Sequence, residues 1–273
     1  MRYADLSPLA NHLWQSTVFV FAAWALALTL RQNRAAVRYW LWLAASVKFL
    51  LPFSLLVSVG SQLGWRTPPA IAQPAFSSVV EEVSQPFSLN TSALAPAPVP
   101  NTMLTLFCVI WFCGVTIGVV LWLRWWGSIH AARRSARPLS LNLPIPALSS
   151  PSSLEPGIFG ILRPVLLLPE GIADRLTSGQ LNAVIAHALC HLRRRDNRTA
   201  GIHMVVKTIF WFHPLVWWIR ARLVKERERA CDEEVVRLSD PQEYAEGILN
   251  VCKFYLESPL VCASGVTGFD LKK

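Results

Sequence analysis

The chain has 273 residues, of which 53% are hydrophobic and 16% are charged, and its formal net charge is +9. Soluble domains usually carry about 25% charged residues, so this composition excludes an ordinary soluble domain and indicates a membrane protein. The basic residues lie beside apolar stretches rather than among interleaved aromatic residues, which argues against direct binding of nucleic acid.

Three stretches are long and apolar enough to be transmembrane helices, which need about 20 residues. They lie roughly at 9–30, 39–63 and 103–123. The positive-inside rule orients them, because arginines follow the first and third stretches and are scarce between the second and third. We expect the N-terminus outside, the loop with Arg31, Arg34 and Arg38 inside, and everything after Arg124 in the cytosol.

These expectations divide the chain into four parts. Residues 1–63 form a transmembrane hairpin, 64–102 an extracytoplasmic loop, 103–123 a third transmembrane helix and 124–273 a cytosolic domain. The loop contains a proline-rich stretch at 95–100, which predicts an extended chain. It is either a spacer or a segment that contacts a partner.

The cytosolic part begins with a stretch at 138–156, rich in Pro, Ser and Leu, that predicts irregular structure. Short apolar runs at 157–169, broken by Gly160 and Pro164, predict a small β-hairpin. A helix should follow, because Thr177 and Gln180 form the pattern of a capping box. We expect this helix to end near the basic run 193–195.

The apolar stretch 202–219 predicts one helix that is embedded in the membrane or partly buried. It is not expected to cross the membrane, because basic residues lie at both of its ends. A charged helix at about 222–238 and a last helix at about 241–257 complete the chain.

The most informative motif is His187-Ala188-Leu189-Cys190-His191. Two histidines four residues apart lie on one helical face and can bind one metal ion. In the zinc-peptidase pattern H-E-x-x-H, a glutamate that acts as general base follows the first histidine. Here that position holds Ala188, which cannot transfer a proton, and Cys190 is a poor substitute and more typical of a packing residue.

A catalytic zinc site needs a third protein ligand on a separate element. Glu228 is the candidate, because Asp232 follows one turn later and could orient a ligand histidine. Glu226 and Glu233 are alternatives, but neither has an acid four residues later. The charged run at 226–234 could instead form a solvated helix face, and the two histidines could be ordinary polar residues.

Four blocks together resemble the BlaR/MecR-type membrane metallopeptidases in order and spacing: Pro156–Glu170, Val184–Asn197, Trp211–Trp218 and Glu226–Glu234. The resemblance implies a mainly α membrane protein with three N-terminal transmembrane helices. These precede a cytosolic gluzincin-like α+β zinc-peptidase domain with a small β-hairpin and a membrane-embedded helix. It also implies a bacterial-type inner membrane as the location.

The resemblance also assigns the site. It implies zinc as the cofactor, His187, His191 and Glu228 as its ligands, and Asp232 as the acid that orients a ligand. The strand at Gly157, Ile158, Phe159 and Gly160 is similar to the edge strand along which gluzincins bind a substrate peptide.

Members of the family transduce antibiotic signals. An outer sensor domain responds to a β-lactam or another signal, and the peptidase cleaves itself or a repressor protein. We expect the lipid bilayer and such a peptide or protein substrate as partners, with a homodimer left open. By this resemblance, we expect the family's last span and sensor to lie beyond the end of the sequence.

Ala188 leads us to expect zinc binding with little or no hydrolysis. The alanine is either natural, in a pseudopeptidase, or a recent or deliberate replacement of glutamate, which the otherwise intact site favours. The leading hypothesis is an inactivated membrane zinc metallopeptidase. The alternatives are a non-catalytic membrane transducer that uses the site to bind peptide or metal, and a scaffold without metal.

Overall fold

The computed structural model describes residues 7–52, 83, 85–87, 101–151 and 156–257. The chain forms two compact units, one from residues 1–120 and 201–226 and the other from 121–200 and 227–273. The predicted loop 64–102, with its proline-rich stretch, and the second half of the predicted span 39–63 fall almost entirely outside the described residues.

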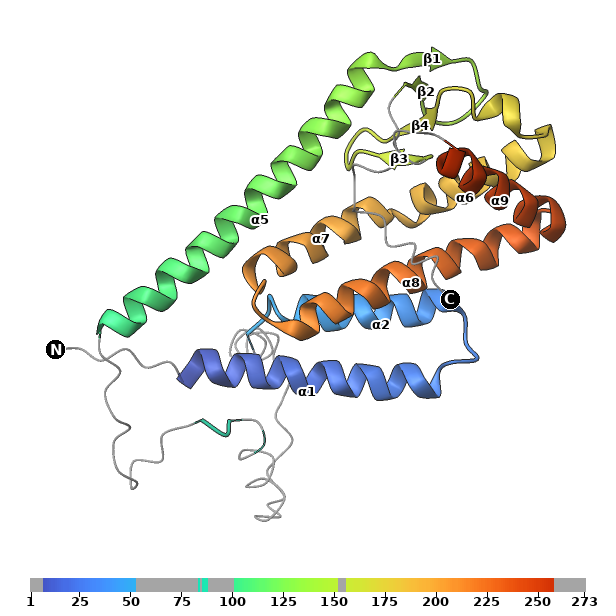
Figure 1. The fold of residues 1–273 in the computed structure, drawn as a ribbon. Helices are drawn as coiled ribbons and strands as arrows, with labels where there is room; N and C mark the ends of the chain where they lie inside the picture. The colour runs from blue at the N-terminus through green and yellow to red at the C-terminus, as the bar shows by residue number, and fades with distance from the viewer. Residues whose placement is uncertain (1–6, 53–82, 84, 88–100, 152–155, 258–273) are drawn as a thin grey trace, which may run out of the picture. The chain divides into compact units, whose positions relative to one another are not determined.

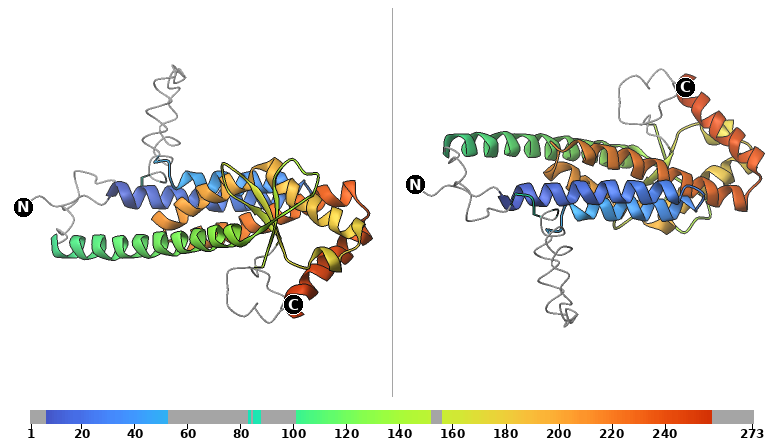
Figure 2. Two further views of the ribbon diagram at one scale, coloured as in Figure 1. Left: turned by 90° about the horizontal axis from the view of Figure 1, so that it is seen from above. Right: turned by 90° about the horizontal axis from the view of Figure 1, so that it is seen from below.

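The first unit is helical and contains α1 (Ser7–Thr29) and α2 (Ala35–Lys48), which lie side by side (Figures 1 and 2). Small side chains, Ala23 and Ala27, are buried on one face of α1, whereas large apolar ones such as Phe21 and Trp24 are exposed on others. A helix that is apolar all round is typical of a lipid environment.

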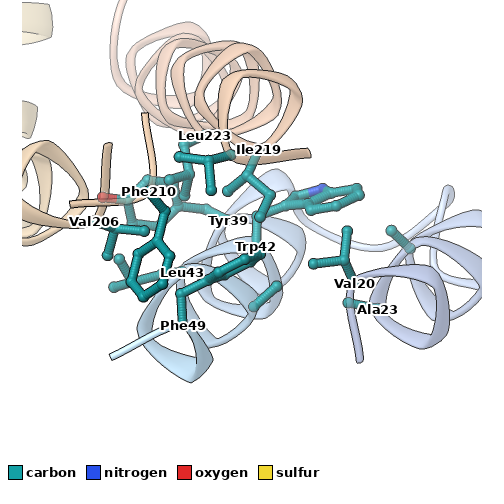
Figure 3. Close-up of a cluster of buried hydrophobic side chains, with 13 residues drawn as sticks. Val20, Ala23, Tyr39, Trp42, Leu43, Phe49, Val206, Phe210, Ile219 and Leu223 are labelled. Carbon is teal, nitrogen blue, oxygen red and sulfur yellow. The ribbon is translucent and has the colours of Figure 1, made fainter. Parts of the chain in front are cut away.

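The core of this unit is rich in aromatic side chains (Figure 3). Trp42 of α2 is fully enclosed and meets Trp218 edge to face, with ring centroids 4.9 Å apart. Phe49 packs on Phe210 at 5.4 Å. Val206, Val216 and Ile219 complete the contact from the other side. The apolar residues at 202–219 therefore pack against the N-terminal helical hairpin.

That stretch is not one helix, and the prediction for 202–219 was wrong in this respect. α7 (Asp196–Ile209) ends before a turn at 210–213, and α8 (Pro214–Leu238) starts at the proline. Proline is well suited to the first position of a helix because it lacks the N–H that would be unpaired there. The predicted charged helix at 222–238 is thus the second part of a longer helix.

Arg38 is buried in this unit and does not act as an exposed charge of the loop. Its Nε donates to Glu226 Oε2 at 2.8 Å, and both side chains are almost fully buried. The same guanidinium donates to backbone carbonyls after α1, those of Leu30, Arg31 and Asn33. Arg38 therefore closes the end of α1 and holds the α1–α2 turn against α8.

Two described helices, not the predicted three, are long and apolar enough to cross a membrane. They are α1 and α5 (Asn101–Ser135), whose apolar side chains are exposed along its length. α2 has 14 residues, fewer than the about 20 that a span needs. It ends shortly before Pro52, and proline disfavours helical geometry in the residue before it.

The second unit contains a four-stranded sheet, with β1 (Arg137–Leu139), β2 (Ala147–Ser150), β4 (Val165–Pro169) and β3 (Gly157–Phe159) in that spatial order. β2 and β4 are parallel, and the two outer pairs are antiparallel. The predicted hairpin is confirmed as β3 and β4. The prediction of irregular structure at 138–156 was wrong, since it contains β2 and most of β1.

Helix α6 (Ser178–Arg194) packs its apolar face on this sheet (Figure 1). The capping box is confirmed, because Thr177 accepts from the Gln180 backbone N–H and the Gln180 side chain accepts from Thr177 N–H. The helix ends at Arg195, whose left-handed backbone (φ 57°) stops it. α9 (Pro241–Glu257) packs beside α6 and has the predicted bounds.

Candidate metal centre

Three polar side chains converge between α6 and α8 in the second unit. His187 and His191 lie one turn apart on α6, and Glu228 comes from α8. The Nε2 atoms of the two histidines are 3.2 Å apart, and Glu228 Oε2 lies 3.4 Å from each of them. Ligands that bind a tetrahedral zinc ion at about 2.0–2.1 Å are separated by about 3.3 Å. The three atoms therefore have the spacing that a shared metal ion requires.

The other oxygen of Glu228 is held by its neighbour. Arg227 donates to Oε1 through Nε at 3.0 Å and through Nη2 at 2.8 Å. Both donors contact the same oxygen, so Oε1 is occupied by a charge-assisted contact. Oε2 is therefore left facing the histidines.

Each histidine has a second partner on its Nδ1 atom. His191 Nδ1 lies 2.7 Å from Asp196 Oδ2, and only 2% of the Asp196 side chain is exposed. His187 Nδ1 lies 2.7 Å from Tyr244 Oη of α9, which donates to Asp232 Oδ1 at 2.7 Å. Asp232 Oδ1 also lies 3.3 Å from His187 Nδ1, so Asp232 contacts this ring both directly and through Tyr244.

The charges around the histidines favour a positive charge among them. Burial lowers the pKa of His187, but the hydrogen bonds and charges of Asp232 and Glu228 outweigh it and raise the pKa to about 9. For His191, burial also lowers the pKa, but the hydrogen bonds to Asp196 and Glu228 outweigh it and raise the pKa above its ordinary value. Burial raises the pKa of Glu228, but the two histidines and Arg227 hold it well below its usual range. The group therefore suits a cation.

Ala188 lies on the side of α6 that packs on the sheet. It is 5% exposed and belongs to an apolar cluster with Leu166, Leu168 and Ile185. Its methyl group can neither accept nor donate a proton. The position that would hold the general base of a zinc peptidase is therefore occupied by a packing residue.

The nearby thiols do not replace that base. Cys190 is fully buried and donates to Glu234 Oε2 at 3.0 Å. Cys231 is also fully buried and lies 3.3 Å from His191 Nδ1. Contact with Cys190 and burial both raise the pKa of the Cys231 thiol. Buried, protonated thiols are inert in proton transfer and as nucleophiles.

The edge strand β3 lies beside α6, and its outer carbonyls already have a partner. Along β4, backbone groups alternate between the two neighbouring strands, and the N–H of Leu166 donates toward β2. Its neighbours Leu167 and Val165 therefore pair with Gly157 and Phe159 of β3. The backbone groups of Ile158 point to the outer edge of the sheet. Asn197 Nδ2 donates to the carbonyls of both Ile158 and Gly160 at 2.9 Å. Asn197 therefore covers this edge of the strand.

The structure brings together most of the residues that the sequence singled out. His187, His191 and Glu228 form one group within 4.8 Å. Of the alternative acids, Glu226 is paired with Arg38, and neither it nor Glu233 belongs to this group in the part of the chain that is described. Gly160 has a positive φ of 102°, where an added Cβ would lie 2.7 Å from the Arg163 carbonyl oxygen. The hairpin turn therefore requires glycine.

Three residues near the site were not predicted: Asp196, Asn197 and Tyr244. Asp196 and Asn197 directly follow the basic run that was expected to end α6. An acid and an amide close behind the histidines could have indicated partners for the site. Tyr244 lies 57 residues from His187 in sequence, and no spacing rule links them.

Comparison with known proteins identifies the family. The sequence profile described as BlaR1 peptidase M56 matches residues 9–268, nearly the whole chain. The chain belongs to the BlaR1 peptidase M56 family. The resemblance noted in the sequence is thereby confirmed. The family is metal-dependent, which agrees with the histidine and glutamate group of this chain.

Curated relatives match over part of their length. The regulatory protein BlaR1 of Bacillus licheniformis is 32% identical over 103 residues, which cover 37% of this chain and 17% of that protein. The methicillin resistance mecR1 proteins of Staphylococcus aureus and Staphylococcus epidermidis are 27% identical over 120 residues, 42% of this chain and 20% of each relative. The match thus spans about a fifth of these M56 relatives.

Proposed function

We propose that this chain is a membrane-bound zinc metallopeptidase of the antibiotic-sensor type whose hydrolytic activity is absent or severely reduced. The observation that carries the proposal is the convergence of His187 Nε2, His191 Nε2 and Glu228 Oε2 at 3.2–3.4 Å. Two imidazoles and a carboxylate in tetrahedral spacing are typical of zinc. Three protein ligands leave one position for water or substrate.

The chain's own residues account for the proposed inactivity. A zinc ion in such a site lowers the pKa of its bound water and polarises a peptide carbonyl. Hydrolysis would also need a group that takes up the water proton and delivers it to the leaving nitrogen, and the methyl group of Ala188 can do neither. General acid–base catalysis contributes roughly 10²–10⁴ in rate, so a loss at least this large is expected.

We propose as its substrate class a peptide segment, either of the chain itself or of a cytosolic repressor. The β3 edge beside α6 supports this, because an extended segment can add to a strand edge through backbone hydrogen bonds once it displaces Asn197 from the β3 carbonyls. Within the bilayer, the proposed orientation places the N-terminus outside and the domain after Arg124 in the cytosol. The exposed apolar faces of α1 and α5 support membrane insertion.

The test has two arms. Purified protein should contain about one zinc ion per chain, and a substoichiometric trace would contradict the metal site. Ala188→Glu should then restore cleavage of the chain or of a co-expressed repressor, whereas Ala188→Gln, of the same size but without a basic group, should not. Equal inactivity of both variants, with zinc bound and the fold intact, would contradict the peptidase proposal.

A second candidate is a non-catalytic transducer that binds a peptide without cleaving it. The burial of Ala188 in the apolar cluster favours this alternative, because position 188 then serves the packing of the core rather than catalysis. If Ala188→Glu lowers the thermal stability and restores no cleavage, this candidate replaces the first.

A further inference from the structure

The two proposed zinc-binding histidines are each held from behind by a buried side chain. We propose that Asp196 and Tyr244 are positioning residues that keep both rings in the tautomer with hydrogen on Nδ1, and so reserve both Nε2 atoms for the metal. The inference rests on the proposed zinc site and extends it, because it assigns roles to two residues outside the ligand set.

For His191 the argument follows from the chemistry of Asp196. An ionised carboxylate only accepts hydrogen bonds. With 2.7 Å between Asp196 Oδ2 and His191 Nδ1, the hydrogen must therefore be on Nδ1. In a neutral ring the lone pair is then on Nε2, the atom that faces Glu228 and His187.

For His187 the same result comes through a relay. The single hydrogen of the Tyr244 hydroxyl is donated to Asp232 Oδ1 at 2.7 Å. Tyr244 Oη can therefore only accept from His187 Nδ1, which lies 2.7 Å away. The ring of Tyr244 also stacks on His187, with centroids 6.0 Å apart and planes inclined by 26°. Hydroxyl and ring thus fix both the tautomer and the orientation of His187.

The two supports come from different parts of the unit. Asp196 directly follows the left-handed residue Arg195, which ends α6 and turns the chain back toward His191. Tyr244 comes from α9 and is 4% exposed. Removing either group takes away the closest partner of a ring nitrogen. Only longer contacts then remain, from Asp232 Oδ1 to His187 Nδ1 and from Cys231 Sγ to His191 Nδ1, both at 3.3 Å, and the ring is held less firmly. The metal-binding atom would then be less well ordered before zinc arrives.

The experiment measures zinc affinity by competition with a chromophoric chelator for the full chain in detergent. Tyr244→Phe, which removes only the hydroxyl, and Asp196→Ala should each weaken affinity by about 10–100-fold, the usual effect of losing such a partner. Asp196→Asn should recover part of the loss, because its amide oxygen can still accept from Nδ1. Tyr255→Phe on α9 and Asp174→Ala at an exposed position are matched controls that should bind like the parent.

Cobalt(II) provides a readout that a general loss of stability would not change. The visible absorption of the cobalt-loaded protein reports coordination geometry, and it should alter in Tyr244→Phe while the metal-free protein keeps the parent's circular dichroism and unfolding temperature. If Asp196→Ala does not fold, Tyr244→Phe and Asp196→Asn still decide the question.

The outcomes separate this inference from the proposed function. If the parent chain binds no zinc, the proposed metal site fails and the inference with it. If the parent binds one zinc and both Tyr244→Phe and Asp196→Ala bind within about three-fold of it, with unchanged cobalt spectra, the positioning roles alone are overturned. A loss in only one variant overturns the role of the other residue.

Discussion

The alanine at position 188 allows metal binding and proton transfer to be considered separately, whereas a glutamate there would contribute to catalysis at the same site. The proposed metal binding depends on His187, His191 and Glu228, whose spacing is set by the helices that carry them. Proton transfer depends on the side chain next to the first histidine, which here is a buried methyl group. A family member can thus keep the geometry for a metal ion while lacking the base for hydrolysis, and the two can be measured independently.

The choice of the third ligand gives a first prediction at this scale. Glu228→Ala should reduce zinc affinity by more than about 100-fold, because loss of a direct ligand costs more than loss of a supporting partner. Glu233→Ala on the same helix is the matched control and should retain zinc. The measurement is metal content after dialysis against a weak chelator. Equal zinc content in the two variants would show that Glu228 is not a ligand.

A second prediction concerns pH. In the metal-free protein the pKa of His187 is about 9, above the ordinary 6.5, so below pH 9 a proton occupies the site and zinc must displace it. Zinc affinity should therefore rise with pH, about ten-fold per unit for each proton displaced. The raised pKa stabilises the metal-free fold below pH 6.5 and this stabilisation is lost as pH rises through 9.

The rise in zinc affinity and the loss of stability of the metal-free protein both increase the stabilisation by zinc as pH rises. The increase in unfolding temperature caused by zinc, held at a fixed free concentration by a metal buffer, should grow between pH 6.5 and 8. A zinc-induced shift that is constant or decreases over this range would contradict the predicted proton competition.

At the scale of elements, the corner between α6 and α7 joins the metal site to the strand edge. Arg195 adopts a left-handed conformation that costs a non-glycine residue roughly 1 kcal/mol. The turn places Asp196 against His191 and Asn197 against β3. Two consecutive residues therefore hold a proposed ligand and the proposed substrate edge.

This corner yields a third prediction. Asn197→Ala removes two hydrogen bonds to the β3 carbonyls, each contributing about 0.5–1.5 kcal/mol. Backbone amides of β3 and β4 should exchange with deuterium roughly 5–150-fold faster, because the strand opens locally more often. Asn182→Ala, at an exposed position of α6, is the control. Unchanged protection of the hairpin in Asn197→Ala would show that the amide does not hold the strand.

Elements with strong local signals were predictable from the sequence, and those that depend on distant partners were not. The capping box at Thr177 and Gln180 and the helix from Pro241 to Glu257 are set by nearby residues. β1 and β2 are three and four residues long and flank a proline-rich stretch, so their sequence resembles a loop. They become strands because β2 pairs with β4, about 19 residues further on.

The same distinction applies to the metal site. The spacing of His187 and His191 is local and could be read from the sequence, and Glu228 was found through Asp232 and the family resemblance. Tyr244 and Arg38 could not be found in this way, because their partners lie 57 and 188 residues away. Arg38 in fact looked like an exposed loop charge, until the structure showed it buried against Glu226.

For the whole molecule, burial of Arg38 changes the argument about membrane orientation without reversing it. Arg31 and Arg34 remain exposed after α1, and Arg133 and Arg134 lie exposed at the end of α5. Orientation depends on basic residues within about 15–20 residues of a span. Both segments therefore still favour the cytosolic side. For both to lie there, the chain must cross the membrane once more between α2 and α5, where most residues are outside the described part.

Reporter fusions in a bacterial host test this orientation as the fourth prediction. Alkaline phosphatase, active only outside the cytoplasm, should be inactive when fused after Asn33, active after Asn101 and inactive after Pro138. Green fluorescent protein at the same positions should give the opposite pattern. Replacing Arg31 and Arg34 by alanine should weaken the bias. The same change at exposed Arg237, which is more than about 20 residues from both apolar helices along the chain, should not. Phosphatase activity after both Asn33 and Pro138 would require the opposite orientation, and would place the metal site outside the cytosol, away from a repressor substrate.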